Sequence, residues 1–273
     1  MSNKLGLILM LTVAISCRKE ANVFPDVAVQ SYTDVKVLGH KAGGGEYSSY
    51  TENTLEAAIY AFTYSDGIET DVQLSRDNTL WLYHDEVIKN CDGVDKRIPG
   101  LTDNEIKAII KCKNLQLNTL KDVFDYQKKS GQLKWISLDI KSWLPTRYSN
   151  TQGYLIRVAD AITKLTLAYK CGSKIIVECE NAYCLNRVKE KDKDIGCFLT
   201  TFGDFDKGAY RALKAGYEGI SYKYSKDLDA EQIKTLHRKG LQIQLWTVND
   251  SSDIAEAIVL SPDFIQTDNV RWR

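Results

Sequence analysis

Two acidic residues alternate along an apolar part of the chain, in the run GIETDVQLS at residues 67–75. Because the side chains of a β-strand point alternately to its two faces, Glu69 and Asp71 lie on the same face. Neighbouring carboxylates repel each other, so they either share a proton or hold a hard cation, and oxygen ligands favour calcium or magnesium. The other interpretation is that one carboxylate faces solvent and binds nothing. Asp139, in the run SLDIK, could complete a cation site or pair with Lys141.

Two of the three histidines, His40 and His84, directly follow apolar runs. Two imidazoles near one cation suit a general acid and a general base, whose proton transfers typically accelerate a reaction about 10²–10⁴-fold. Each could instead be a hydrogen-bonded histidine at the end of a strand. The third, His237, falls on an expected surface helix and is interpreted as structural. Beside His40, Lys41 and the glycines at 43–45 could contact an anion, or they could be a solvated lysine and a flexible loop.

The elements that must position these residues alternate between strand-like and helix-like patterns, which indicates parallel βαβ units. A hairpin is expected between residues 67–75 and 78–87. The fold predicted is a (β/α)8 TIM barrel. The alternative is an open doubly wound sheet, but no G-x-G-x-x-G fingerprint follows the first expected strand. In such barrels the active site forms at the C-terminal ends of the strands, where the acidic residues and histidines fall. The eight expected strands are 35–40, 67–75, 134–141, 173–180, 195–202, 217–224, 241–249 and 263–269.

The composition narrows the classes of function. The 273 residues carry 36 basic and 36 acidic side chains, so there is no basic excess for binding nucleic acid. Seven cysteines are present, and their spacing matches no zinc-binding pattern. We expect one or two disulfides at most, because several cysteines lie in apolar runs where a free thiol behaves as a small apolar side chain.

The N-terminus is typical of an export signal. A lysine and an apolar run of about 11 residues precede Ala14-Ile15-Ser16-Cys17, and that run is too short to span a bilayer as a helix. The tetrapeptide resembles a bacterial lipobox, whose cysteine becomes the lipidated first residue; the alternative is an ordinary secretory signal with a coincidental cysteine. We therefore expect a lipoprotein signal peptide at 1–16, a tether at 17–34 and the barrel at 35–273. The protein would be an exported bacterial lipoprotein, anchored through Cys17 to a membrane in the periplasm or at the cell surface.

The order of the motifs resembles the glycerophosphodiester phosphodiesterase family. The resemblance rests first on His40-Lys41, on Glu52-Asn53-Thr54, on Glu69-x-Asp71-Val72 and on His84-Asp85. It continues through LNTLKDVFD, SLDIK, LWTVN and DFIQTDN, and it covers roughly residues 35–270. The resemblance implies a (β/α)8 barrel with a small insertion after the second strand, near residues 86–118. It also implies hydrolysis of glycerophosphodiesters to glycerol 3-phosphate and an alcohol, with a divalent cation as cofactor.

The resemblance also implies roles for individual residues. His40 and His84 correspond to the catalytic acid/base pair. Glu69, Asp71 and Asp139 correspond to the ligands of the cation, Ca²⁺ or Mg²⁺. Four more residues correspond to positions that contact substrate or support the histidines: Lys41, Glu52, Lys141 and Trp246, with Glu52 expected near His40.

Four positions depart from the family pattern. The usual His-Arg-Gly is His40-Lys41-Ala42, and lysine cannot make arginine's bidentate contact with phosphate. Thr51 replaces a proline, and Asp139 replaces a glutamate. These departures keep two alternatives open: a phosphoinositol diesterase or phospholipase on the same barrel, and a non-catalytic lipoprotein that binds sugar phosphates.

Overall fold

The predicted barrel is present and closed. A computed structural model describes residues 35–144 and 150–272. Eight parallel strands form the ring, because the first strand pairs on one side with the last and on the other with the second. In spatial order, the ring strands are β1 (Lys36–Gly39), β2 (Gly67–Leu74), β6 (Trp135–Ile140), β7 (Ile175–Cys179), β8 (Gly196–Thr201), β9 (Gly219–Lys223), β10 (Gln242–Trp246) and β11 (Phe264–Thr267).

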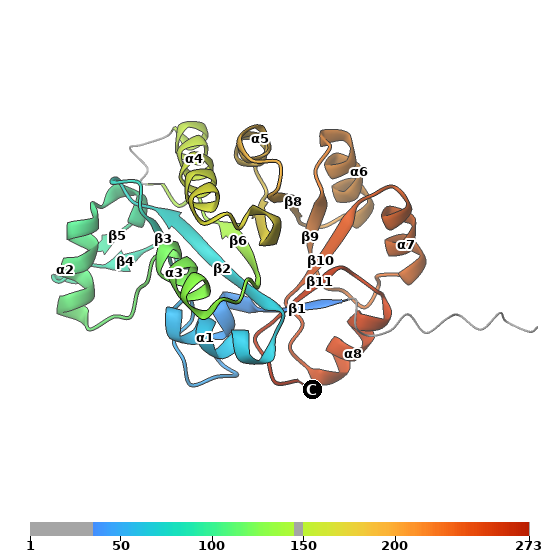
Figure 1. The fold of residues 1–273 in the computed structure, drawn as a ribbon, viewed down its shortest axis with the longest axis horizontal. Coiled ribbons are helices and arrows are strands. Elements are labelled where there is room, and N and C mark those ends of the chain that lie inside the picture. Colours follow the sequence, from blue (N-terminus) through green and yellow to red (C-terminus); the bar gives the residue numbers. More distant parts are fainter. Residues whose placement is uncertain (1–34, 145–149, 273) are drawn as a thin grey trace, which may run out of the picture. The chain divides into compact units, whose positions relative to one another are not determined.

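Helices connect the successive strands on the outside of the ring (Figure 1). Each buries an apolar stripe against the strands, and α1 alone contributes Ala57, Ala58, Ala61 and Phe62 to the main core. None of the described helices combines the length and apolar character needed to cross a membrane. The connecting helices are α1 (Leu55–Tyr64), α3 (Leu120–Ser130), α4 (Thr151–Tyr169), α5 (Ala182–Lys191), α6 (Phe205–Ala215), α7 (Ala230–Arg238) and α8 (Ser251–Val259).

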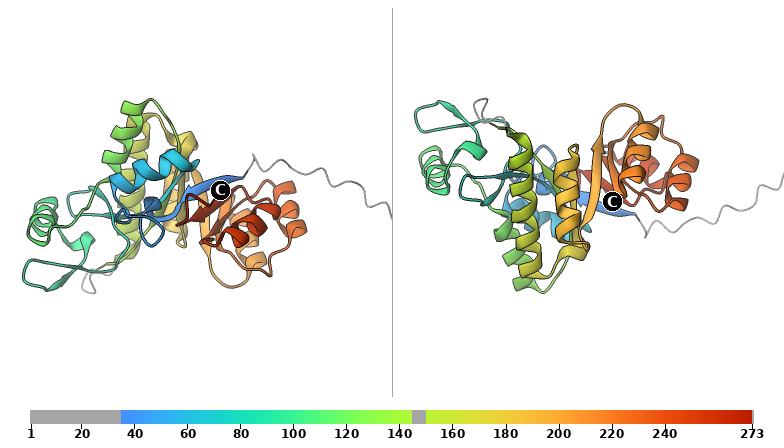
Figure 2. Two further views of the ribbon diagram at one scale, coloured as in Figure 1. Left: turned by 90° about the horizontal axis from the view of Figure 1, so that it is seen from below. Right: turned by 90° about the horizontal axis from the view of Figure 1, so that it is seen from above.

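The expected hairpin and insertion follow β2. The strand β3 (Leu80–Leu82) pairs antiparallel with the end of β2 and is shorter than the predicted run, because the chain leaves the sheet just before His84. The insertion, residues 86–118, contains β4 (Ile88–Lys89), β5 (Asp95–Lys96) and α2 (Asp103–Lys113). It projects from one side of the barrel in each view of Figure 2.

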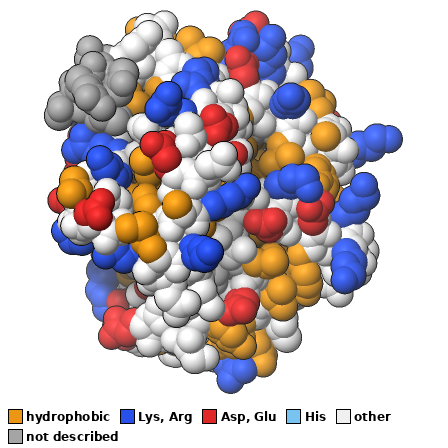
Figure 3. Space-filling view, turned by 90° about the vertical axis from the view of Figure 1, so that its left-hand side faces the viewer, with side chains coloured by type: hydrophobic (Ala, Val, Ile, Leu, Met, Phe, Trp, Pro, Cys, Tyr) orange, Lys and Arg blue, Asp and Glu red, His pale blue; other side chains and the backbone are white. Residues whose placement is uncertain are grey.

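The insertion has its own apolar cluster and a covalent link. Trp81 and Ile88 pack there with Ile98, Ile106 and other apolar side chains. A disulfide joins Cys91 to Cys112, which agrees with the expected number of one or two bridges, whereas Cys171, Cys179, Cys184 and Cys197 are buried free thiols. On the side of the molecule shown in Figure 3, basic and acidic side chains are interspersed, in keeping with the zero net charge.

The inside of the barrel is layered. Leu38, Ile176, Phe198 and Phe264 form an apolar layer. Two residues further along their strands, Glu178 on β7 and Gln266 on β11 belong to a buried polar layer that also includes Ser137, Ser221 and Gln244. Because residues i and i+2 of a strand share a face, both layers follow from the alternation of side chains. His40 and Asp139 lie at or near the C-terminal ends of β1 and β6, and Glu69 and Asp71 lie level with them in the middle of the longer β2.

The predicted signal peptide, the lipobox cysteine Cys17 and the tether lie outside the described residues.

Candidate functional site

Three carboxylates from two neighbouring strands converge at the C-terminal end of the barrel. Asp71 on β2 is in register with Asp139 on β6, and Glu69 lies two residues before Asp71 on the same face. One carboxylate oxygen from each lies within 4.8 Å of the others. Glu69 and Asp71 are each 2% exposed, so little water solvates their charges. The structure therefore brings together the three predicted metal ligands.

The electrostatics of this acidic trio follow from its burial. Burial raises the pKa of Glu69 well above its ordinary value, and the charges of Asp71, Glu178 and Asp139 raise it further, against a lowering hydrogen bond from the backbone N–H of Lys41. Burial also raises the pKa of Asp139, although the ammonium group of Lys141 opposes this shift. Three acidic groups held this close in a buried site suit a hard cation that takes oxygen ligands, so the donor set fits Ca²⁺ or Mg²⁺.

Lys141 contacts two members of the trio. Its Nζ atom lies 2.6 Å from Oδ2 of Asp139 and 3.0 Å from Oδ1 of Asp71. Burial alone would lower the pKa of Lys141, but the two carboxylates raise it, so the side chain is held as an ammonium. The sequence left open whether Asp139 joins the acidic residues or pairs with Lys141, and the structure shows both contacts.

His40 lies beside the acidic trio and is oriented by an aspartate that directly follows the last strand. Its Nδ1 atom is 2.7 Å from Oδ1 of Asp268, and its Nε2 atom is 3.8 Å from Oε2 of Glu69. A carboxylate accepts hydrogen bonds, so Nδ1 carries the proton and Nε2 faces the trio. Burial opposes ionisation of Asp268, but hydrogen bonds from His40 and Asn249 lower its pKa overall.

A left-handed turn directly after His40 places the backbone of Lys41 in the site. Lys41 and Ala42 have φ values of +49° and +61°, which non-glycine residues rarely adopt. The turn aims the backbone N–H of Lys41 at Oε2 of Glu69, 2.8 Å away. Gly44 then passes so close to Glu52 that an added Cβ would lie 2.4 Å from the Glu52 Cα, which explains the glycine at this point of the loop.

Glu52 contacts Lys41, the neighbour of His40, and not the imidazole ring of His40. It does not hydrogen-bond His40, whose partner is Asp268; its Oε2 instead accepts a 2.9 Å bond from Nζ of Lys41. Glu52 also offers a carboxylate oxygen within 4.8 Å of ligand atoms of His84 and Asp85. Lys41 and Glu52 thus connect the surroundings of His40 with those of His84, so both histidines lie at the same mouth of the barrel.

His84 is the more exposed of the two histidines. Its side chain is 38% exposed and its Nδ1 atom lies 2.9 Å from Oδ1 of Asp85. At the end of β10, the ring of Trp246 meets Phe202 edge-on, with the ring centres 5.9 Å apart. The indole Nε1 of Trp246 is buried and has no hydrogen-bond partner among the described residues.

No role for Asn53 or Asp268 was predicted from the sequence. Asn53 donates to Oδ2 of Asp71 at 2.8 Å and accepts from Thr70 Oγ1 and the Asp71 backbone N–H, so it fixes the orientation of one predicted ligand. The only sequence signals for the two residues were their places in the motifs Glu-Asn-Thr and DFIQTDN.

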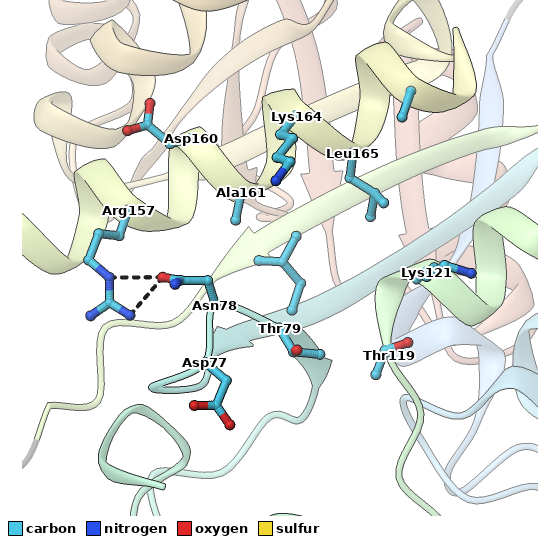
Figure 4. A pocket seen from close by; sticks show the side chains of 12 residues that line it. Asp77, Asn78, Thr79, Thr119, Lys121, Arg157, Asp160, Ala161, Lys164 and Leu165 are labelled. Carbon is cyan, nitrogen blue, oxygen red and sulfur yellow. Dashed lines mark hydrogen bonds between the residues drawn. The ribbon is translucent and has the colours of Figure 1, made fainter. Parts of the chain in front are cut away.

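A large surface groove lies away from this chemistry. It has a volume of about 620 Å³ and lies between α3, α4 and the turn before β3, where Arg157 bonds Asn78 (Figure 4). None of the site residues lines it. Its lining residues are Asp77, Asn78, Thr79, Leu80, Thr119, Lys121, Arg157, Asp160, Ala161, Lys164, Leu165 and Ala168.

Comparison with known proteins assigns all of the barrel after β1 to one family. Residues 40–271 match the model of the glycerophosphoryl diester phosphodiesterase family. A glycerophosphodiester phosphodiesterase of Caldanaerobacter subterraneus subsp. tengcongensis is 24% identical over 241 residues, which cover 85% of this chain and 93% of that protein.

Solved structures show the same fold. A glycerophosphodiester phosphodiesterase from Thermotoga maritima is 27% identical with a TM-score of 0.65, covering 86% of this chain and 95% of that one. A phosphodiesterase from Oleispira antarctica, solved with the product sn-glycerol-3-phosphate, is 20% identical with a TM-score of 0.67, covering 86% of this chain and 93% of that one.

Proposed function

The chain belongs to the glycerophosphoryl diester phosphodiesterase family, and from this premise we propose that it is a cation-dependent enzyme that uses His40 and His84 to cleave glycerophosphodiesters. The reaction class is hydrolysis of a phosphoric diester, which yields glycerol 3-phosphate and an alcohol. The observation that carries the proposal is the convergence of Glu69, Asp71 and Asp139 beside a histidine whose Nε2 atom faces them.

The acidic trio would hold the divalent cation. When bound, Ca²⁺ or Mg²⁺ supplies charge neutralisation and polarisation of the phosphodiester. Asn53 keeps Asp71 in its orientation, and the backbone N–H of Lys41 does the same for Glu69. These contacts fix two of the three carboxylates before any ligand arrives, which lowers the cost of organising the site.

Two ammonium groups are placed to meet the charge of the phosphate. Lys141 lies within the acidic trio and Lys41 lies at its edge, where Glu52 holds it. Fixed positive charges in a partly buried site stabilise negative charge that develops in the transition state. Lysine acts there as a point charge rather than as the fork-shaped donor that arginine provides.

The two histidines would move the protons. Asp268 keeps the proton of His40 on Nδ1, so Nε2 can exchange a proton with a group in the site. His84, at the more open side, would serve as the second proton carrier. One histidine activates the nucleophile and the other protonates the leaving alcohol. Trp246, at the end of β10, would contact the substrate through its ring.

A phospholipase or phosphoinositol diesterase activity is the second candidate. It is favoured by exposed aromatic side chains on loops at the mouth, since Trp143 is 39% exposed and Phe202 is 64% exposed. Exposed apolar side chains near a catalytic site suit a substrate that is presented in a lipid surface. In that case a neighbouring hydroxyl of the substrate would act as the nucleophile and a cyclic phosphate would be released first.

We also propose that the protein is an exported lipoprotein attached to a membrane through Cys17. The support is the residue pattern Ala14-Ile15-Ser16-Cys17 after a short apolar run. Expression of wild type and Cys17→Ser in a bacterial host, followed by fractionation, tests this. Wild type should sediment with membranes and Cys17→Ser should not, whereas identical fractionation would contradict the anchor.

The enzymatic proposal is tested with purified protein, a chelator and a panel of diesters. The panel contains glycerophosphocholine, glycerophosphoethanolamine, glycerophosphoinositol and phosphatidylinositol. We expect turnover of a glycerophosphodiester that the chelator abolishes and that Ca²⁺ or Mg²⁺ restores. His40→Ala and His84→Ala should each lose about 10²-fold or more. His237→Ala is the matched control, because His237 pairs with Asp263 and lies outside the candidate site.

The outcomes separate the alternatives. A cyclic phosphate from phosphatidylinositol would support the second candidate. No turnover of any diester with either cation would favour a protein that only binds its ligand. Wild-type rates in His40→Ala would contradict the acid/base assignment.

A further inference from the structure

The segment around His84 has no regular secondary structure, yet its backbone is held at three successive carbonyl groups. The carbonyls of Tyr83 and Asp85 each accept a 2.9 Å hydrogen bond from Nε2 of Gln73. The carbonyl of His84 itself accepts a 3.2 Å bond from Nε1 of Trp143. Two side chains therefore fix the peptide groups on both sides of the histidine, and neither touches its imidazole ring by these bonds.

Gln73 is built into the strand that carries two predicted metal ligands. Glu69, Asp71 and Gln73 alternate along β2, so all three side chains point to the same face. Gln73 is fully buried, and both hydrogens of its amide nitrogen are used on carbonyls 83 and 85. The reverse orientation of the amide would place its oxygen against two carbonyl oxygens, so the orientation is fixed by chemistry.

The remaining atom of the amide shows that this arrangement has a cost. Oε1 of Gln73 is buried and has no hydrogen-bond partner among the described residues. An unsatisfied buried acceptor typically disfavours the folded state. Packing of the barrel alone therefore does not explain a glutamine at position 73. The two hydrogen bonds that it donates do explain it.

We infer that Gln73 is a positioning residue for His84, and that it ties the backbone of this histidine to the strand bearing Glu69 and Asp71. The link keeps the second imidazole at a constant distance from the acidic trio, although His84 belongs to a loop. Trp143 supports the same peptide group from the β6 side. The kinetic part of this inference rests on the proposed function, but the structural part does not.

The test uses Gln73→Met, which keeps the length of the side chain and removes both donors. Gln244→Met is the matched control, because Gln244 is equally buried in the barrel and donates to Ser221 instead, and its Oε1 also has no partner within the part of the chain that the structure describes. Trp143→Phe removes the other donor at a partly exposed position and remains informative if Gln73→Met folds poorly.

Two readouts are measured on the full mature chain. The chain has only three histidines, so the imidazole signals of His40, His84 and His237 can be followed by NMR and assigned with single alanine variants. The second readout is steady-state turnover of glycerophosphocholine with saturating cation. Misplacement of a catalytic group by about 1 Å can cost about 10²-fold in rate.

In Gln73→Met we expect the His84 signal to shift or broaden while that of His237 is unchanged. We expect kcat to fall about 10–10²-fold with a smaller change in KM. Trp143→Phe should change both readouts in the same direction and by less, and Gln244→Met should leave the His84 signal in place.

The inference is overturned if the His84 signal of Gln73→Met matches that of wild type, whatever the rate. It is also overturned if Gln244→Met disturbs His84 as much, because the effect would then be general loosening of the barrel. If the His84 signal moves but wild type itself turns over no diester, the positioning role stands and the proposed function falls.

Discussion

The Nδ1 atom of His40 lies 2.7 Å from a carboxylate oxygen of Asp268, although the two residues are separated by 228 positions in the sequence. Closure of the barrel creates this contact, because β1 and β11 are neighbours and Gly39 is in register with Thr267. Asn249 donates a 2.6 Å bond to the other oxygen of Asp268 and accepts from its backbone N–H at 2.9 Å. The first and last strands of the ring together set the proton position of one imidazole.

Replacing Asp268 by Asn should therefore impair turnover without unfolding the protein. The amide can no longer enforce a proton on Nδ1, so part of the population will carry the wrong tautomer, and we expect kcat to fall about 10²-fold. The control is Asp263→Asn, which alters the 2.9 Å pair with His237. In steady-state kinetics, kcat should fall in Asp268→Asn and not in Asp263→Asn. Equal losses of kcat in the two variants would show that the His40–Asp268 pair has no special role.

Divalent cations should stabilise the protein more at high pH than at low pH. The pKa values of Glu69 and Asp139 are raised in the folded state, so the folded protein binds more protons than the unfolded chain in the window above their ordinary values. Without cation, stability therefore falls as pH rises through that window. A cation needs the ionised carboxylates and opposes this fall.

The measurement is the rise in Tm on adding Ca²⁺ or Mg²⁺ at pH 5 and at pH 8. We expect the larger rise at pH 8 and almost none in Glu69→Gln/Asp71→Asn. An equal rise at both pH values, or one that persists in the double variant, would argue against this site.

Glu178 should contribute a pH dependence of stability of its own. Burial and then the charge of Asp139 raise its pKa to about 7 in the folded state. The folded protein then binds the extra proton between the ordinary glutamate value and about pH 7, so stability drops as pH rises across that interval. Glu178→Gln cannot bind this proton. The Tm of the variant should therefore rise relative to that of wild type as the pH increases to about 7. Parallel Tm curves for the two proteins would refute this role of Glu178.

The disulfide of the insertion should matter for local stability. Cys91 and Cys112 are 21 positions apart, and closing a loop of that size stabilises a fold by about 3 kcal/mol in the chain-entropy model. The double variant Cys91→Ser/Cys112→Ser should make the insertion more susceptible to proteolysis. A matched double variant of the buried thiols Cys171 and Cys179 controls for loss of cysteine as such. Equal protease resistance of wild type and the first variant would contradict the expectation.

Much of the fold could be predicted from the sequence because βαβ alternation is a local property. Each strand run is short and apolar, and each polar residue at its end falls at the same edge of a parallel sheet. The closeness of Glu69 and Asp71 needed only the alternation of side chains along one strand, and Asp139 needed only the pairing of β2 with β6.

The contacts that hold the site together could not be predicted in this way. The pairs His40–Asp268 and Gln73–Asp85 join residues whose contact depends on barrel closure or on the path of a loop. Asn53 reaches Asp71 from a backbone with a φ of +57°, which no periodic pattern indicates. The contact of Glu52 with Lys41 rather than His40 depends on the left-handed turn at Lys41 and Ala42.

The most direct test is a crystal structure of the protein soaked with Mn²⁺, whose anomalous signal locates the ion. The described residues offer two groups that could hold it: Glu69, Asp71 and Asp139, or Glu52, His84 and Asp85. The expected result is a peak bound by the first group, with both imidazoles unligated. A single peak on the second group would contradict it, because His84 would then be a metal ligand and not a proton carrier.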